Sequence, residues 1–172
     1  YTNYSGDGGV GIGSFFRRLG FALRYSELNL LISNQLSDDS KLIMERNVVS
    51  RVKKAAPFLY TDNDPYLALI DRQLFWIIDM YTVSDKYPYA QPADTRRINE
   101  NSGLPMNFNY LRNSVKAVVN AYDGTLNFYV VDENDPLILS YNDIFPDLFT
   151  AKSSMSNELL DHIRYPEDLF TI

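Results

Sequence analysis

The segment 115–131 constrains the fold most, because it reads as two β-strands joined by a tight turn. Val115, Ala117 and Val119 occupy every second position, which is the period of a strand with one buried face. Asp123-Gly124 follows, a residue pair typical of a type I′ turn, and the chain returns over 125–131. The segment therefore predicts a β-hairpin and an antiparallel sheet.

A second pair of strands is expected upstream. The runs 66–71 and 74–83 are rich in aromatic and aliphatic residues, and Asp71-Arg72-Gln73 lies between them. We therefore predict a first hairpin here, although it lacks an Asp-Gly pair at its turn.

Helical patterns flank these hairpins on both sides. Their signals are apolar residues at helical spacing, cap residues such as Asn47, and Pro136 at a first helical position. The expected helices cover 15–25, 41–46 after Asp38-Asp39-Ser40, 48–56, 136–145, a segment around 159–163, and a start at Pro166. The sequence predicts an α+β fold, with two antiparallel β-hairpins (about four strands) flanked by N- and C-terminal helices.

The length of 172 residues suits one domain with its own core. We expect a single soluble domain over 1–172, with a glycine-rich entry loop over 1–13 and a long irregular loop over 84–112. The chain begins at Tyr1 rather than Met, so we expect it to be a piece excised from a longer protein.

Charge and composition exclude several functions. The formal net charge is -6, which disfavours nucleic acid as a partner. Cysteine is absent, so thiol catalysis and thiolate metal sites are excluded within this chain. No apolar run approaches the roughly 18 residues of a membrane-spanning helix.

Short motifs that resemble catalytic or binding sites lack their partners. Gly6, Gly8 and Gly11 match the dinucleotide glycine spacing, but no preceding strand is expected. Ser50 and Lys53 match a serine–lysine motif on what reads as a solvated helix face, and His162 is the single histidine. We therefore expect no catalytic residues, no cofactor and no metal ligands.

Weak calcium binding remains an open alternative for two acidic loops. They are Asp62-Asn63-Asp64 and Asp132-Glu133-Asn134-Asp135. Turn formation also accounts for both, because Asp and Asn side chains bond to their own backbone.

One stretch has a composition that a core does not need. Tyrosines, a proline and charged residues lead out of the expected second strand into the long loop. The candidate binding residues are Tyr81, Ser84, Asp85, Lys86, Tyr87 and Tyr89. They form either a contact surface for a peptide, glycan or neighbouring domain, or a set of tyrosines folded back onto the sheet.

Several long strings of residues along the chain resemble one protein family. The most specific are 84–89 (SDKYPY), 112–116 (RNSVK), 121–125 (AYDGT) and 164–170 (RYPEDLF). In these strings the chain is similar to uncharacterised protein family 0182, large multi-pass bacterial membrane proteins with a big extracytoplasmic region. The resemblance covers nearly the whole chain, and Arg72-Gln73 departs from the Asp-Gly turn expected in the first hairpin.

The resemblance implies a membrane-anchored parent, with this piece on the outer side of the cytoplasmic membrane. It implies no activity, cofactor or catalytic residue. We therefore expect a non-catalytic extracytoplasmic domain whose partner is the parent membrane domain or another envelope protein.

Two alternatives remain open at this point. One is part of an enzyme that acts on cell-envelope polymers through carboxylates such as Asp79 and Asp85. The other is a purely structural spacer above the membrane.

Overall fold

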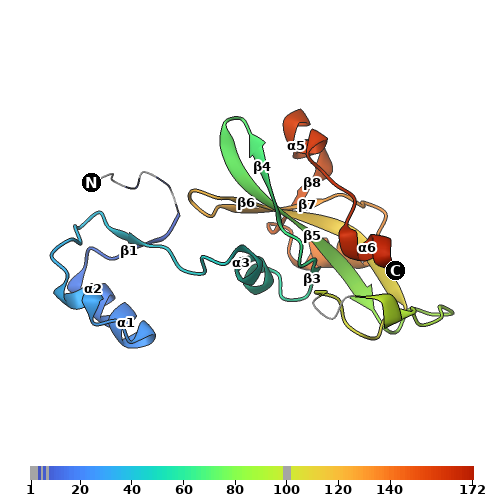
Figure 1. Cartoon of the computed structure of the whole chain (residues 1–172), viewed down its shortest axis with the longest axis horizontal. Helices are drawn as coiled ribbons and strands as arrows, with labels where there is room; N and C mark the ends of the chain where they lie inside the picture. Colours follow the sequence, from blue (N-terminus) through green and yellow to red (C-terminus); the bar gives the residue numbers. More distant parts are fainter. Residues whose placement is uncertain (1–3, 5, 7, 99–101) are drawn as a thin grey trace. The chain divides into compact units, whose positions relative to one another are not determined.

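The long strand β5 (Gln73–Ser84) is the element around which most of the chain is arranged (Figure 1). The computed structural model describes residues 4, 6, 8–98 and 102–172. These fall into two compact units, Tyr1–Arg46 and Asn47–Ile172, which we describe separately. The expectation of a single domain over 1–172 stays a prediction.

The second unit contains a mixed sheet in the order β3-β5-β6-β7-β8, with β4 also paired to β5. β5 pairs with β6 along one edge and with β3 and β4 along the other. All pairs are antiparallel except β7 with β8, which are parallel. The strands are β3 Tyr60–Thr61, β4 Tyr66–Ile70, β6 Tyr110–Asn120, β7 Leu126–Val130 and β8 Phe149–Ala151.

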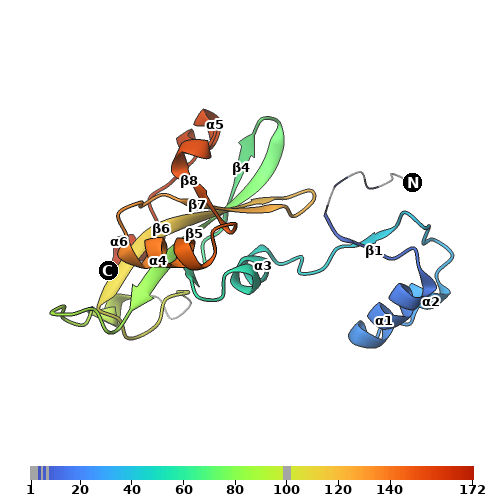
Figure 2. The same cartoon turned by 180° about the vertical axis from the view of Figure 1, so that it is seen from behind.

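Helices cover both faces of this sheet, since α6 lies in front of it in Figure 1 and α4 in front of it in the reverse view of Figure 2. One face packs Ile78, Met80 and Val115 against Val52 and Ile138. The opposite face packs Ile77 and Val118 against residues such as Met155 and Leu159. The helices are α3 Val48–Ala55, α4 Pro136–Ile144, α5 Asn157–Asp161 and α6 Glu167–Thr171.

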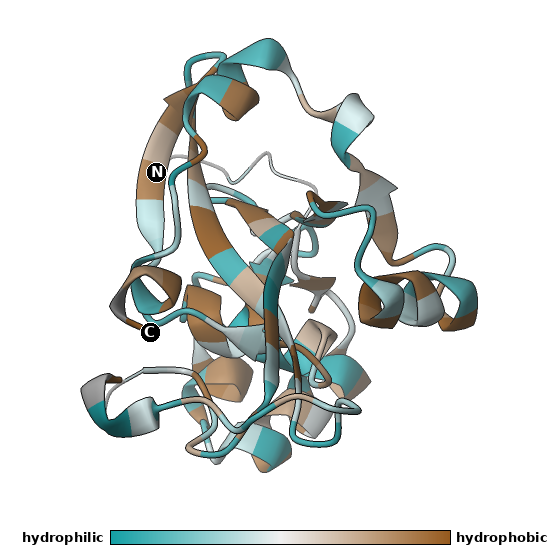
Figure 3. Cartoon of the chain, turned by 90° about the vertical axis from the view of Figure 1, so that its right-hand side faces the viewer, coloured by the Kyte–Doolittle hydropathy of each residue, from teal (hydrophilic) through white to brown (hydrophobic). Residues whose placement is uncertain are grey.

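The α+β class is confirmed, and the detail of two hairpins is incomplete. Figure 3 shows hydrophobic and hydrophilic residues along the strands. Alternation predicted β6, whereas richness in aromatic and aliphatic residues predicted β4 and β5. β3 and β8, which have two and three residues, were not predicted. Such short edge strands are too short to show a period.

The turns also differ from expectation. Asp71 and Arg72 both have positive φ and join Ile70 to Gln73, which is the type I′ arrangement. At the second hairpin only Gly124 has positive φ, and the loop closes through Asn120 N donating to Thr125 O at 2.9 Å. The type I′ turn predicted at Asp123-Gly124 is therefore a longer turn, which the Asn120 side chain stabilises by accepting from Tyr122 N.

The first unit joins α1 (Phe15–Tyr25) and α2 (Asn29–Ile32) to a small sheet of β1 (Val10–Gly11) and β2 (Lys41–Leu42). The helix predicted over 41–46 is wrong, because Lys41 and Leu42 pair with β1 and Glu45 has positive φ. An isolated helix of that length is marginal, so strand pairing prevails. In the described chain no helix combines the length and apolar character needed to cross a bilayer.

A buried ion pair joins the two central strands of the sheet, β5 and β6. Asp79 and Lys116 are register partners on β5 and β6, both are buried, and the Lys116 ammonium donates to the Asp79 carboxylate. Burial raises the pKa of Asp79 more than the nearby Lys116 lowers it. Lys116 Nζ also donates to Arg164 O at 2.9 Å, so the pair fixes the chain between α5 and α6.

A second buried carboxylate holds the start of α4. Asp135 is the N-cap of α4 and accepts a hydrogen bond from Leu137 N at 2.9 Å. Its carboxylate also accepts hydrogen bonds from the hydroxyl groups of Thr82, Ser114 and Tyr110. Burial raises the pKa of Asp135, but the hydrogen bonds from Ser114, Thr82 and Tyr110 together lower it by more. The net pKa of Asp135 is therefore below its ordinary value. This carboxylate therefore joins α4 to β5 and β6.

Replacing Asp135 by Ala removes the cap and the acceptor that the hydroxyl groups of Thr82, Ser114 and Tyr110 share. We expect a loss of about 2–4 kcal/mol in the free energy of unfolding at pH 7, measured by urea denaturation. Because the folded pKa is lowered, the stabilisation is present above the unfolded pKa and is lost as pH falls through the folded value. The Asp135→Ala variant should show a smaller loss of stability below about pH 4 than the native chain; equal acid sensitivity contradicts this.

Removing only one partner of the central ion pair should be costly. We expect Lys116→Met to lower the free energy of unfolding by about 3–5 kcal/mol, since Asp79 is left buried without its counter-ion. The double variant Asp79→Leu with Lys116→Met should lie closer to the native stability. A double variant as unstable as the sum of the two single variants would show that the pair is not coupled.

Candidate functional site

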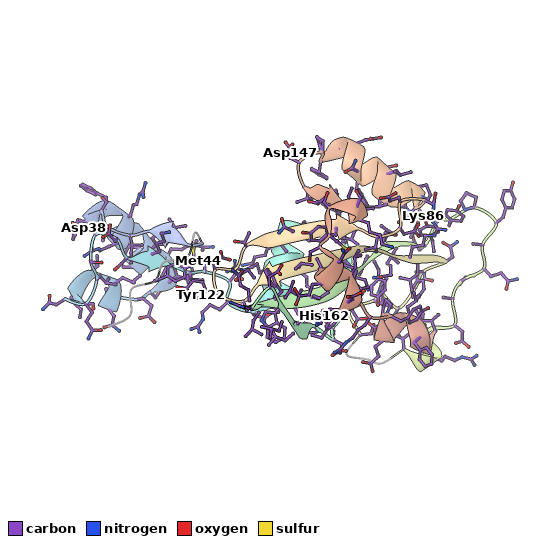
Figure 4. All side chains as sticks on the ribbon, turned by 90° about the horizontal axis from the view of Figure 1, so that it is seen from above. Asp38, Met44, Lys86, Tyr122, Asp147 and His162 are labelled. Atoms are coloured by element: carbon purple, nitrogen blue, oxygen red, sulfur yellow. The ribbon has the colours of Figure 1, made fainter. Side chains whose placement is uncertain are left out.

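The loop that follows β5 contains most of the candidate binding residues. Figure 4 labels Lys86 on it. Ser84 is the last residue of β5, and its hydroxyl accepts from Lys86 N at 3.1 Å. Asp85 and Lys86 are exposed. The chain therefore leaves the sheet in an ordered local turn that directs charged side chains outward.

Asn109 fixes the shape of this loop. Its side chain accepts from Tyr87 N at 2.9 Å and donates to Tyr87 O at 2.8 Å, and its amide nitrogen also lies 3.3 Å from Ala90 O. Its backbone N donates to Ser84 O at 2.9 Å. One amide side chain thus satisfies backbone groups that a free loop would leave to water.

The tyrosines of this region divide into buried and exposed groups. Tyr87 is 43% exposed, and its ring stacks on Tyr110 with centroids 4.6 Å apart. Tyr110 in turn donates to the buried Asp135 at 2.5 Å, and burial together with this bond raises the pKa of Tyr110. Tyr89 is fully exposed and has a φ of 60°. A side chain in the left-handed region is strained, so the loop presents Tyr89 at an energetic cost.

Tyr81 is buried and therefore does not belong to a contact surface. It is 0% exposed, and its hydroxyl donates to Asp62 at 2.6 Å, because β5 turns this residue to the same buried face as Ile77 and Asp79. Burial and the bond to Asp62 raise its pKa strongly. The structure therefore brings together Ser84, Asp85, Lys86, Tyr87 and Tyr89 on one loop and separates Tyr81 from them.

The two carboxylates of the enzyme alternative do not meet. Asp79 is buried beside Lys116, whereas Asp85 is exposed beyond the end of β5. The strand from Asp79 to Ser84 alone spans roughly 17 Å at the usual rise per residue. Glycosidase carboxyl groups lie about 5–9.5 Å apart, so this pair does not form that arrangement.

The other motifs have structural surroundings. Val10–Gly11 form β1, so the glycines do not open a helix as a dinucleotide site requires, and Asp7 within the motif lies outside the described residues. Ser50 and Lys53 are exposed on α3. His162 is exposed, with Nδ1 2.8 Å from Glu158 O.

The two acidic loops use their carboxylates in internal bonds. Asp62 accepts from Asp64 N and Tyr81, and Asp132 accepts from Asn134 N. Over 8–98 and 102–172, together with residues 4 and 6, no three His, Cys, Asp or Glu side chains are arranged to hold a metal ion.

Sequence reasoning missed a hollow of about 530 Å³ beside the C-terminal segment. It is surrounded by residues of β6, residues that follow β7 and β8, the link between α5 and α6, and α6 itself, and they include several cations. Its lining is Leu111, Arg112, Asn113, Lys116, Val131, Asp132, Lys152, Ile163, Arg164, Tyr165, Pro166 and Leu169. The strings at 112–116 and 164–170 were visible in the sequence, but nothing there indicated that they meet.

Comparison with known proteins places the chain in a family. A family model described as an uncharacterised protein family, UPF0182, matches residues 1–172. A UPF0182 protein of Trichodesmium erythraeum is 49% identical over 180 residues, covering 100% of this chain and 20% of the relative. A UPF0182 protein of Corynebacterium efficiens is 45% identical over 181 residues, covering 100% of this chain and 18% of the relative.

The chain thus spans about a fifth of the length of the curated relatives it matches. No solved structure matches it. The resemblance seen in the residue strings is confirmed by a match over the full 172 residues. On this evidence the chain belongs to the uncharacterised protein family UPF0182.

Proposed function

We propose that this chain is a non-catalytic, extracytoplasmic interaction domain of a longer bacterial membrane protein, and that Ser84, Asp85, Lys86, Tyr87 and Tyr89 form its contact loop. The observation that carries the proposal is Tyr89, which is fully exposed, has positive φ and belongs to a loop fixed by Asn109. Tyrosine is enriched at protein interfaces because a large apolar ring is joined to a polar tip.

Pre-organisation supports a binding role for this loop. The bonds of Asn109 and the stacking of Tyr87 on Tyr110 order the loop before any partner arrives. A partner then loses less conformational entropy on binding, so more of the contact energy appears as affinity. A solvated connection would not need strained backbone at an exposed aromatic residue.

We take the partner to be another region of the same polypeptide. The relatives are about five times longer than this chain, so most of such a protein lies outside it. A tethered region reaches an effective concentration in the millimolar range, which favours it over a separate envelope protein. The placement outside the cytoplasmic membrane rests on the family resemblance.

Tyr89→Ala should separate binding from stability. Tyr89 is fully exposed, so we expect the alanine variant to change the free energy of unfolding by less than about 0.5 kcal/mol. In a second variant, a photo-crosslinking residue replaces Tyr89 in the full-length protein. We expect it to react with residues outside this chain. Tyr122, which is 59% exposed on the β6–β7 turn, is the matched control position. Mass spectrometry of the crosslinked products identifies the partner. A crosslinking yield at position 89 that is no higher than at position 122 refutes the contact loop. Crosslinks to other proteins alone refute the proposal that the partner belongs to the same polypeptide.

The proposed location is tested by thiol labelling. Within this chain cysteine is absent, so Lys86→Cys in the full-length protein adds one exposed thiol on the loop. A membrane-impermeant maleimide should label it in intact cells beyond the background of the native protein. Labelling only after the cells are permeabilised would place the domain on the cytoplasmic side.

A further inference from the structure

The hollow beside the C-terminal segment gathers cations in an acidic chain. Arg112, Lys116, Lys152 and Arg164 line it together with the single carboxylate of Asp132, although the net charge of the whole chain is -6. The segment between α5 and α6, which supplies Arg164, runs along this face of the sheet (Figure 1). The local charge is therefore opposite in sign to that of the chain.

Two of these cations are already neutralised. Lys116 pairs with the buried Asp79, and Arg112 lies 3.3 Å from Asp132. Lys152 and Arg164 are exposed and pair with no carboxylate in the described part of the chain. They leave a positive charge on the hollow that has no internal counter-ion.

Arg164 is held in place by other contacts. Its guanidinium lies 4.6 Å from the centroid of the Tyr66 ring, and its carbonyl accepts from Lys116 Nζ at 2.9 Å. Stacking of this kind limits the freedom of the side chain and does not neutralise its charge. The cation is therefore pre-positioned, which lowers the entropy cost of binding an anion.

The remaining lining is apolar. Leu111, Val131, Ile163 and Leu169 contribute side chains, and Tyr165 adds a ring that is 68% exposed. A volume of about 530 Å³ falls in the range of small-molecule sites. An anion with an apolar substituent would satisfy both parts of this lining.

We propose that this hollow binds a phosphate-bearing small molecule, with the phosphate at Lys152 and Arg164 and an apolar substituent against Leu111, Val131 and Ile163. Phosphate suits a site with a guanidinium and an ammonium, because both form charge-assisted hydrogen bonds to its oxygens. The site shares no residue with the contact loop 84–90, so either proposal can fail without the other.

Calorimetric titration of the 172-residue chain at low ionic strength tests the site. The probes are inorganic phosphate, hexyl phosphate and hexanol. We expect hexyl phosphate to bind at least about tenfold more tightly than inorganic phosphate, because two or more methylene groups leave water. Hexanol should bind more weakly than hexyl phosphate, and raised salt should weaken the phosphate probes.

Variants identify the cations. Lys152→Gln and Arg164→Gln should each lower the affinity for hexyl phosphate by about tenfold, while Lys53→Gln on α3 removes the same charge and should change it less than about twofold. Both target side chains are exposed, so unchanged amide spectra will show that the fold is kept. The site is overturned if all three variants lose affinity equally, or if hexyl phosphate does not bind at millimolar concentration. If inorganic phosphate binds as tightly as hexyl phosphate, the apolar part of the site is overturned.

Discussion

The larger unit depends on the two bonds that the buried ammonium group of Lys116 donates. This group joins Asp79 on the neighbouring strand to the carbonyl of Arg164 near the C-terminus. Asp79 O also accepts from Asp62 N, and the Asp62 carboxylate accepts from Tyr81. The Lys116–Asp79 pair thus joins β5 and β6 to the link between α5 and α6, and the backbone of Asp79 joins β5 to the residues after β3.

Such a network costs desolvation energy and stabilises one arrangement over others. An apolar pair at these positions would pack the sheet equally well, as buried ion pairs often contribute little net stability. It would not supply the ammonium group that binds the carbonyl of Arg164. The backbone position of Arg164, which borders the hollow, follows from the polar pair together with the packing of its neighbour Ile163 against the core.

Asp135 has the corresponding role for α4, the end of β5 and the first half of β6, where it accepts from Thr82, Ser114 and Tyr110. It fixes Tyr110, and Tyr110 supports the ring of Tyr87 in the contact loop. The contact loop and the hollow therefore each rest on a buried carboxylate. Local sequence patterns do not reveal this, because Asp135 is 25 residues from Tyr110 and 53 from Thr82.

What the sequence could predict was local. Asn47 as the cap of α3 and Asp135-Pro136 at the start of α4 were readable because cap and helix are adjacent in the chain. The β2 pairing that displaced a helix at 41–46 depends on residues 10–11, far from it in sequence. The burial of Tyr81 was within reach, since a strand period places it with Ile77 and Asp79, but its tyrosine neighbours suggested a surface.

The same separation explains why a net charge of -6 does not reveal the cations that line the hollow. Asp62, Asp79, Asp135 and Asp168 are all buried, so their charges are compensated or hydrogen-bonded inside the unit. Burial even raises the pKa of Asp168, whose carboxylate accepts from Ser102 at 2.9 Å. With these acids inside, Lys152 and Arg164 stay exposed beside the hollow although the composition is acidic. The potential that a ligand meets is set by which charges remain at the surface, and that depends on the fold.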